Sequence, residues 1–324
     1  MKLGIFINDI NSEKPEYTTT RLAMAAVHRG HDVWYIGAGN FACDPDDALR
    51  AQAGRAPTGE TDQETFLKGL EPERITVDDL DALWLRSDPA DDVPNRFWAQ
   101  TAGILFGGLA ERRGVRVVNS PAGLSLALSK LYLHHFPLEV RPKTLITRDH
   151  DEVRRFAHDH GGRAVIKPLQ GSGGHGVFIV TPEDEVNLDQ MIDAVIRDGY
   201  LIAQEHLPAA GGGDVRLFML DGEPLQADGV YAAFRRIPGE GEARANMSAG
   251  ASVEPAEIDD RILRIAGLVG PKLAEDGMFL AGLDIVGNCL LEINVFSPGG
   301  LGSVLSLTGV DFNEIVVEAL ERKL

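Results

Sequence analysis

The feature that most constrains this chain is residues 282–294 near the C-terminal end, which read Gly-Leu-Asp-Ile-Val-Gly-Asn-Cys-Leu-Leu-Glu-Ile-Asn. Two apolar strands joined by a short turn would carry three oxygen-bearing side chains, Asp284, Glu292 and Asn294. Burying an unpaired carboxylate is costly, and an all-oxygen ligand set suits Mg²⁺ better than Zn²⁺. The segment therefore predicts a hairpin that holds Mg²⁺, with Mn²⁺ as an alternative ion.

The register of this hairpin decides whether the three side chains meet, because strand side chains alternate between two faces. The expected core set is Leu283, Ile285, Leu291 and Ile293. An odd-length loop, such as residues 287–289, places Asp284 opposite Glu292, with Asn294 on the same face. A two-residue turn at residues 287–288 would instead separate Asp284 from Glu292. The competing interpretation is an acidic sheet face that simply contacts water.

Length and charge limit the functions that this chain can have. At 324 residues it has room for a large core divided into two or three lobes. A composition of 44% hydrophobic and 25% charged residues is typical of a globular enzyme. The formal net charge of -18 argues against nucleic acid and against anionic membranes as partners, since both require a basic surface. A small anionic ligand needs only a local cluster of cations.

The cysteines and the N-terminus favour a cytoplasmic location. Cys43 and Cys289 lie far apart and match neither a disulfide framework nor a zinc-ligand spacing. The apolar run at the N-terminus is too short for a signal peptide and soon meets Asp9. No apolar run approaches the length of a membrane span.

The first part of the chain predicts a β-α-β unit and hence a parallel sheet. A strand at residues 2–8 precedes a helix over Thr18–Arg29 that Gly30 ends, and a strand follows at Asp32–Ile36. Residues 39–79 are acidic and lack apolar periodicity, so they predict a long surface excursion. This first lobe then continues with a strand at residues 80–86, a helix at 97–113 and a strand at 115–119, and it ends near residue 122.

The rest of the chain predicts two further lobes with mixed helices and strands. The second has a helix over Ser125–Phe136, strands at 144–146, 164–168 and 176–180, and helices at 149–160 and 186–198. The third has strands at 201–205, 214–220 and 225–233, a helix at 257–275, the hairpin, and a helix at 311–322. The stretch 235–250 is rich in Gly, Arg and Ala and predicts a flexible loop.

A glycine-rich loop lies between two strands of the second lobe. Gly171, Ser172, Gly173 and Gly174 begin a literal G-x-G-x-x-G match. A strand follows this loop, whereas a dinucleotide site needs a helix there. No Gly-Lys-Ser/Thr completes a P-loop, and the sequence has neither of the kinase segments His-Arg-Asp and Asp-Phe-Gly. The remaining interpretations are a flap whose N–H groups approach phosphate beside Lys167, or an ordinary hairpin turn.

Other residues fit a nucleotide site. The stretch Gln204, Glu205, His206 and Leu207 ends a strand and predicts a hinge between lobes whose backbone is offered to an adenine ring. Asp214 and Arg216 are two residues apart on one strand and therefore share a face. Arg216 would neutralise developing phosphate charge, or would merely form a surface ion pair with Asp214. Lys130 lies in the predicted helix, where a solvated lysine is the simpler interpretation.

These parts, in this order, resemble the ATP-grasp ligases and, in particular, the bacterial glutathione synthetases. The matching segments are Leu85–Pro89, Val118–Pro121, Lys167–Gly174, Leu207–Pro208, Asp221–Pro224, Arg236–Pro238 and Gly282–Pro298, and they cover most of the chain after residue 80. The resemblance implies an α/β fold of α+β lobes. It has a Rossmann-like N-terminal domain at 1–122, a lid at 123–200 and a C-terminal ATP-grasp lobe at 201–324.

The resemblance also implies roles for particular residues. Lys130 and Lys167 match the lysines that bind the phosphates of ATP, and residues 171–174 match the phosphate flap. The hinge at residues 204–207 and Asp214 match the nucleotide site. Arg216, together with Arg244 in the loop over the reaction centre, would stabilise the transferred phosphate. The metal ligands would be Asp284, Glu292 and Asn294.

The implied activity is an ATP- and Mg²⁺-dependent ligation of γ-glutamylcysteine to glycine through an acyl phosphate. A homo-oligomer is implied as well. The sequence departs from the family pattern at Ser87, in residues 10–18, and in residues 299–303, where the run Gly-Gly-Leu-Gly-Ser has no cation. These departures fall in the substrate-binding parts, so a ligase for another amino acid or peptide pair and a non-catalytic nucleotide-binding regulator stay as alternatives.

Overall fold

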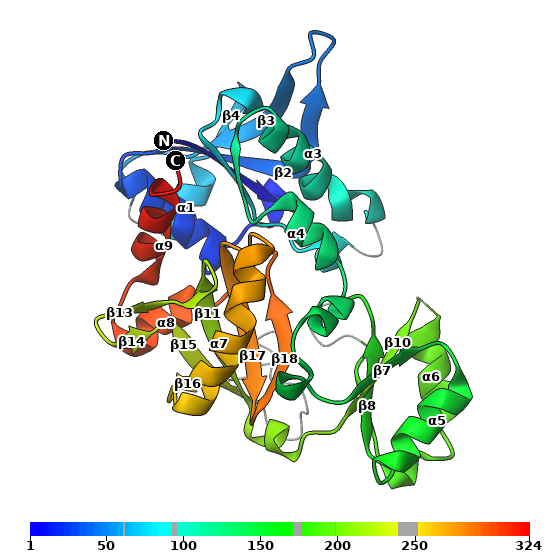
Figure 1. The fold of residues 1–324 in the computed structure, drawn as a ribbon. Helices are drawn as coiled ribbons and strands as arrows, with labels where there is room; N and C mark the ends of the chain where they lie inside the picture. Colours follow the sequence, from blue (N-terminus) through cyan, green and yellow to red (C-terminus); the bar gives the residue numbers. More distant parts are fainter. Residues whose placement is uncertain (61, 93–95, 172–175, 198, 239–251) are drawn as a thin grey trace.

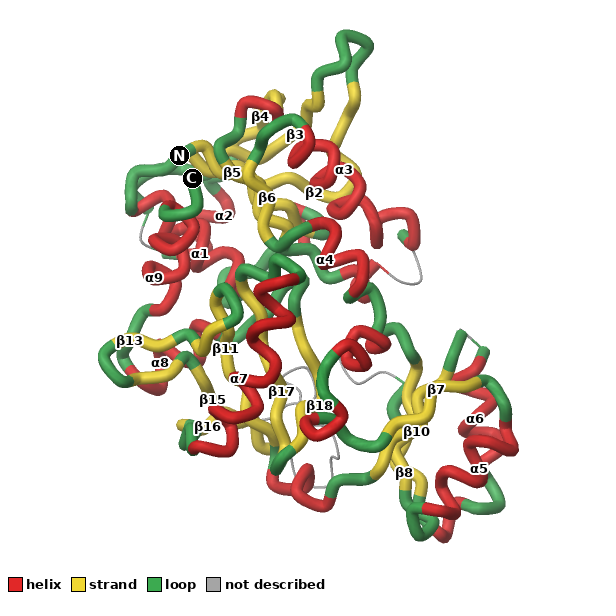
Figure 2. The backbone as a smooth tube through the Cα atoms, in the orientation of Figure 1, coloured by secondary structure: helices red, strands yellow, loops and turns green. Residues whose placement is uncertain are grey.

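The computed structural model describes residues 1–60, 62–92, 96–171, 176–197, 199–238 and 252–324. Its strands form three main sheets that follow one another along the chain (Figure 1). Helices pack against each of them, so the architecture is mixed α/β, as the sequence predicts (Figure 2).

The first sheet begins with the predicted β-α-β unit. β1 (Lys2–Ile7) and β2 (Asp32–Cys43) pair in parallel, and α1 (Thr18–His28) connects them. Gly30 follows α1 with a φ of +84°, a conformation that glycine adopts at little cost. The parallel part of the sheet is completed by β5 (Ala82–Leu85), α3 (Ala102–Arg112) and β6 (Arg116–Val118).

Residues 39–79 are not the surface excursion that their composition predicts. β2 continues to Cys43 and is followed by β3 (Leu49–Arg55), α2 (Gln63–Lys68) and β4 (Glu71–Thr76). β3 and β4 extend the first sheet as antiparallel strands, which gives the spatial order β4-β3-β2-β1-β5-β6.

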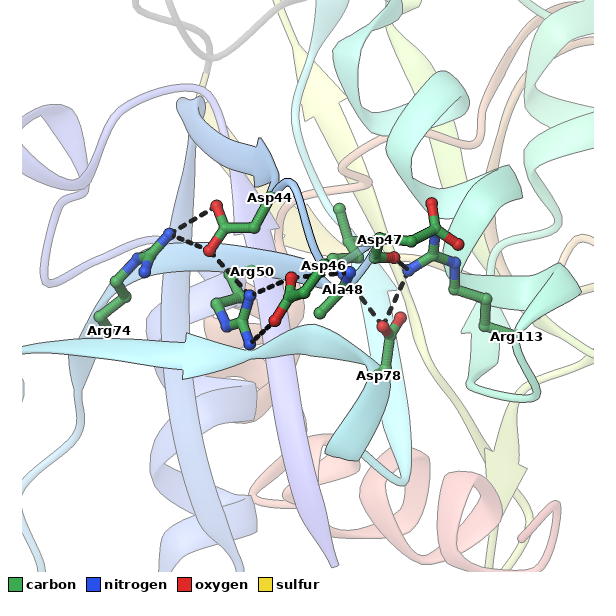
Figure 3. A network of polar contacts seen from close by, with 9 residues as sticks. Asp44, Asp46, Asp47, Ala48, Arg50, Arg74, Asp78 and Arg113 are labelled. Atoms are coloured by element: carbon green, nitrogen blue, oxygen red, sulfur yellow. Dashed lines mark hydrogen bonds and ion pairs between the residues drawn. The ribbon is translucent and has the colours of Figure 1, made fainter.

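Arginines of β3 and β4, and one that follows α3, pair with the acids of this segment. Arg50 and Arg74 both donate to Asp44, with N···O distances of 2.7 Å. Arg113, just beyond α3, donates to Asp78 at 2.9 Å (Figure 3). A strand need not be apolar when its charged side chains are paired across the sheet. This pairing is why an apolar-periodicity test misses β3 and β4.

The helix predicted over residues 125–136 is wrong. α4 (Pro121–Leu126) ends early, and a separate 3₁₀ helix spans Lys130–His135. The backbone N–H of Lys130 donates to the carbonyl of Leu169 at 3.0 Å, so it is not available to a continuous helix. The Ser129 hydroxyl accepts from Leu131 N and starts the new turn, as short polar side chains do at helix ends.

The second sheet has the order β7-β10-β8-β9 and is antiparallel throughout. Its elements are β7 (Thr144–Thr147), α5 (His150–Asp159), β8 (Ala164–Pro168), β9 (Phe178–Val180), α6 (Leu188–Ile196) and β10 (Leu201–Glu205). α5 and α6 share with this sheet an apolar core of their own, centred on Val153, Ile166 and Ile192. The segment therefore has the internal packing of a small lobe.

The third sheet has the order β16-β15-β11-β17-β18. Its strands are β11 (Asp214–Leu220), β15 (Ala233–Ile237), β16 (Ser252–Pro255), β17 (Leu280–Val286) and β18 (Cys289–Asn294), and α7 (Asp260–Glu275) precedes β17. The single strand predicted over 225–233 is wrong. Positive φ angles at Asp228 and Gly229 turn the chain there, which leaves the short strands β12 (Glu223–Pro224), β13 (Gln226–Ala227) and β14 (Val230–Tyr231).

The C-terminal helices return to the N-terminal sheet. α8 (Leu301–Thr308) lies between two glycines in the left-handed conformation, Gly300 and Gly309, so the glycine-rich sequence conceals it. α9 (Phe312–Glu321) packs against α1 and shares its apolar cluster. Within the described part of the chain, no helix combines the length and apolarity needed to cross a membrane.

Asn119 joins the first sheet to the third. Its side-chain amide donates to the carbonyls of Leu280 and Val295, and its oxygen accepts from Leu280 N at 3.0 Å. Only 1% of Asn119 is exposed. These bonds hold the end of β6 against the start of β17, which leads into the hairpin.

We expect Asn119→Ala to lower the free energy of unfolding by about 1–3 kcal/mol, because the buried Leu280 N–H would lose its acceptor. Urea denaturation measures this change. Asn11→Ala, at an exposed position, is the control and should change stability by less than about 0.5 kcal/mol. Equal stability of the two variants would contradict the assigned contact.

Candidate active site

The hairpin of β17 and β18 brings Asp284 opposite Glu292, as the sequence predicts, but by a different route. Val286 pairs with Cys289, so the turn is the two-residue Gly287-Asn288 rather than the expected odd-length loop. An irregularity next to Asp284 adds one residue, Leu291, to β18 and restores the register. The core set changes accordingly, since Leu290 is fully buried and Leu291 is not.

Asp284 is the centre of a buried charge network. Arg216 lies directly opposite on β11 and binds both carboxylate oxygens through its Nε–Nη2 edge, with Nη2 2.8 Å from Oδ2. Arg236 on β15 places Nη2 2.8 Å from the same oxygen and also binds Asp214 bidentately at 2.7 and 2.8 Å. Asn294 Nδ2 donates to Asp284 Oδ2 at 3.1 Å. The alternative surface pair between Arg216 and Asp214 is therefore wrong.

Burial and pairing set the charge states in this network. Burial alone would raise the pKa of Asp284, but Arg216 and Arg236 hold that pKa below its usual range. Burial, followed by the nearby charge of Asp284, raises the pKa of Asp214 to about 6. At this face of the sheet, two arginines of β11 and β15 therefore lie among two largely buried aspartates of β11 and β17.

The sequence predicts a loop at residues 235–250 and therefore gives no role in the site to Arg236. The residue pairs with Asp214 in the β11–β15 register, two strands away from the hairpin. The strand Ala233–Ile237 puts Arg236 and Phe234 on one face, which is the signal that was available.

Beside this network, a pocket open to solvent lies between the second and third sheets. The predicted site residues that line it are Lys130, Lys167, Gly171, Gln204, Glu292 and Asn294. Apolar side chains from both sheets, Ile146, Ile202 and Ile293 among them, form the rest of the wall. Such a mixture of apolar walls and a few converging polar groups is typical of a ligand site.

The two lysines of the pocket contact different elements. Lys130 Nζ lies 3.1 Å from Glu292 Oε1 and donates to the carbonyl of Gly171. Lys167 Nζ donates to Gln204 Oε1 at 3.1 Å. Burial lowers the pKa of Lys167 to about 8. The pocket therefore holds two cations and a carboxylate whose charges depend on one another.

The remaining described nucleotide candidates, Glu205, His206, Leu207 and Asp214, are not among the residues that line the pocket. Glu205 accepts from Lys143 N at 2.8 Å, and His206 and Leu207 follow it in the connection from β10 to β11. Asp214 begins β11 on the network side of the pocket. Four other candidates, Ser172, Gly173, Gly174 and Arg244, lie outside the described residues.

The donor set at the hairpin fits a hard divalent cation. Asp284 and Glu292 are opposite one another, and the amide of Asn294 turns its nitrogen to Asp284, which leaves its oxygen for another partner. Glu292 is 40% exposed and faces the pocket. Within the described ranges no three His, Cys, Asp or Glu side chains are grouped so that they could hold a metal ion.

A segment next to the network, residues 297–301, is held from several sides. Arg216 Nη1 donates to Gly299 O at 3.3 Å. The hydroxyl of Thr18, at the start of α1, accepts from Gly300 N and Leu301 N at 3.0 and 3.2 Å. The segment without a cation that the sequence analysis singled out is thus fixed between the first and third sheets.

Comparison with known families identifies both parts of the chain. Residues 1–125 match the family described as the prokaryotic glutathione synthetase N-terminal domain. Residues 129–309 match the prokaryotic glutathione synthetase ATP-grasp domain.

Individual relatives agree with these matches. A glutathione synthetase of Gloeobacter violaceus is 32% identical over 99% of this chain and 96% of its own length. One from Agrobacterium fabrum is 37% identical over 78% of this chain and 75% of its own. Among solved structures, the D-cycloserine synthetase DcsG has a TM-score of 0.67 at 16% identity and 99% coverage of both chains. A D-alanine–D-alanine ligase from Bacillus anthracis has a TM-score of 0.59 at 16% identity, covering 99% of this chain and 96% of that one.

We expect the affinity for ATP to fall about tenfold between about pH 7 and pH 9, because Lys167, with its pKa of about 8, loses its charge there. Calorimetric titration across this range measures the change. Lys167→Arg is the control and should show no such fall, since a guanidinium stays protonated. An affinity of the original protein that does not change with pH would contradict a phosphate-binding role for Lys167.

Proposed function

Since the chain belongs to the prokaryotic glutathione synthetase family and is an ATP-dependent carboxylate–amine ligase, we propose that it joins γ-glutamylcysteine to glycine. Family membership favours this enzyme over the alternative of a non-catalytic regulator. The identity of the acid and of the amine is the proposed part, because a fold alone does not fix a substrate.

One observation carries the assignment of the nucleotide site. The open pocket gathers Lys130, Lys167 and Gln204 from the segment around the second sheet, and Glu292 and Asn294 from β18. Two cations suit the phosphates of ATP, and the apolar wall suits the adenine ring. We assign the phosphates to the two lysines and to the loop that begins at Gly171. We assign the adenine ring to Gln204 and to the chain that follows it, through residue 207.

We assign Asp284, Glu292 and Asn294 as the ligands of a divalent cation, Mg²⁺ by preference because every donor is oxygen. When bound, this ion neutralises charge on the phosphates during transfer. Arg216 and Arg236 keep Asp284 ionised, so its carboxylate remains a competent ligand at neutral pH.

The chemistry requires activation of a carboxylate, which is a poor acyl donor at neutral pH. Transfer of the γ-phosphoryl group to the acid gives an acyl phosphate, and the amine then displaces phosphate to form the amide. We assign Arg216 to the charge that develops on the transferred group, since it lies beside the metal ligands and contacts residue 299. Arg244 is assigned to the same charge by resemblance alone.

The three sheets support the proposed division into a domain at residues 1–122, a lid at 123–200 and a C-terminal lobe at 201–324. The separate apolar core of the second sheet suits a lid that moves as a unit. We also propose a homo-oligomer, because Phe97, Trp98 and Leu105 are 75%, 51% and 66% exposed near one another in sequence. The two free cysteines support the proposed cytoplasmic location.

The test is release of ADP from Mg-ATP with γ-glutamylcysteine, with and without glycine, and detection of glutathione by mass spectrometry. We expect turnover that depends on glycine, because the acyl phosphate needs an amine to complete the reaction. Omission of Mg²⁺ should abolish it.

No turnover from protein that still binds Mg-ATP would overturn the proposed substrates and leave the ligase assignment in place. A screen of other acids and amines then follows, and a productive pair would identify the alternative ligase.

A further inference from the structure

Arg86 lies at the junction between the first and third sheets. It follows β5 at the carboxyl end of the parallel strands, the edge at which ligands bind in such sheets. Its Nε donates to the Thr19 hydroxyl at 2.9 Å, and its Nη2 donates to Ser297 Oγ and to Pro298 O at 3.3 and 3.2 Å. Only 2% of the residue is exposed.

The charge of Arg86 lacks a carboxylate partner among the described residues. Its three acceptors are neutral oxygens, and no acid in the described ranges lies within salt-bridge distance. Glu13, the acid with most influence on Arg86, binds the hydroxyl of Thr20 instead. By contrast, Arg216 and Arg236, which are buried to a similar extent in the neighbouring network, are each paired with aspartates.

A buried charge without an ion partner is unfavourable, and burial also shifts pKa values at this junction. Burial lowers the pKa of Arg86 to about 10 and raises the pKa of Glu13. The cation stays charged at neutral pH, and among the described residues Glu13 compensates it only through space, without an ion pair.

Arg86 and Arg216 contact neighbouring residues of the same segment. Arg86 holds the carbonyl of Pro298, and Arg216 holds the carbonyl of the next residue, Gly299. The two guanidinium groups therefore bind consecutive peptide units of one segment. No described residue accepts a hydrogen bond from Arg86 Nη1, which leaves this nitrogen for a further acceptor.

We propose that Arg86 binds a substrate carboxylate that does not react, completing the ion pair that the folded chain lacks. This inference rests on the proposed function and deepens it by naming a group that the substrate must have. Two sources supply such a carboxylate under that function. One is the α-carboxylate of the γ-glutamyl residue, and the other is the carboxylate of glycine.

The test compares Arg86→Met, Arg86→Lys and Asn119→Ala with the original protein. Met removes the charge at similar length, and Lys keeps the charge but loses the planar fork. Asn119→Ala is the matched structural control, because it also breaks buried hydrogen bonds between the first and third sheets. Retained binding of Mg-ATP verifies that each variant is folded.

We expect Arg86→Met to raise the KM of one substrate at least about tenfold, while the KM of ATP stays within about twofold. A tenfold change corresponds to about 1.4 kcal/mol, which is the usual cost of losing a hydrogen bond to a charged group. Arg86→Lys should recover part of the loss. Asn119→Ala should leave both substrate KM values near those of the original protein. If Arg86→Met and Asn119→Ala raise all three KM values alike, Arg86 is structural and the inference fails.

Analogues identify the source of the carboxylate. If Arg86 binds glycine, Arg86→Met and the original protein should use glycinamide equally poorly. If Arg86 binds γ-glutamylcysteine, Arg86→Met and the original protein should use 4-aminobutyrylcysteine equally poorly, because this analogue lacks the α-carboxylate. A full penalty of Arg86→Met with both analogues would contradict the proposal.

Failure of the proposed function is a separate result. If the original protein does not turn over γ-glutamylcysteine and glycine, calorimetry with each compound still tests Arg86. Binding that Arg86→Met abolishes supports the inference, and absence of binding to the original protein overturns it.

Discussion

The ion pair between Arg216 and Asp284 is the interaction on which the rest of the site depends. The two residues lie opposite each other on β11 and β17, so the pair exists only in one register of the third sheet. Arg236 and Asn294 bind the same carboxylate from the flanking strands. A shift of one residue in any of these strands would turn a member of the network to the other face.

Contacts between the sheets hold the segments on either side of the hairpin in place. Asn119 binds the start of β17, while Arg86 and Thr18 hold residues 297–301 beyond the end of β18. The pocket lies against the second sheet, and Glu292 and Asn294 of the hairpin line it from the third sheet. The hairpin of β17 and β18 is thus the common wall of the proposed nucleotide and substrate sites, which is the arrangement that phosphoryl transfer between two bound molecules requires.

Local signals in the sequence were sufficient for much of this fold. The β-α-β opening, the glycine that ends α1 and the strands of the second sheet follow from periodicity and turn chemistry. The sequence also predicts that Asp284 and Glu292 lie opposite one another. It does not predict the two-residue turn or the irregularity opposite Asp284. Two local deviations compensated each other there, and neither has a clear signature in a single sequence.

What the sequence did not reveal depends on contacts between distant segments. β3 and β4 carry Arg50 and Arg74, which pair with Asp44 in the turn before β3 (Figure 3). The break before Lys130 results from its bond to Leu169, which lies in another part of the chain. The unpaired charge of Arg86 is visible only when burial and partners are known together.

The central claim is that this charged sheet face transfers a phosphoryl group to a carboxylate. Turnover of an acid labelled with ¹⁸O in its reacting carboxylate tests it most directly, with mass spectrometry of the released phosphate. We expect one ¹⁸O atom in the phosphate, because the acid's oxygen bridges carbon and phosphorus in the acyl phosphate. Phosphate without the label, formed together with the amide product, would contradict it.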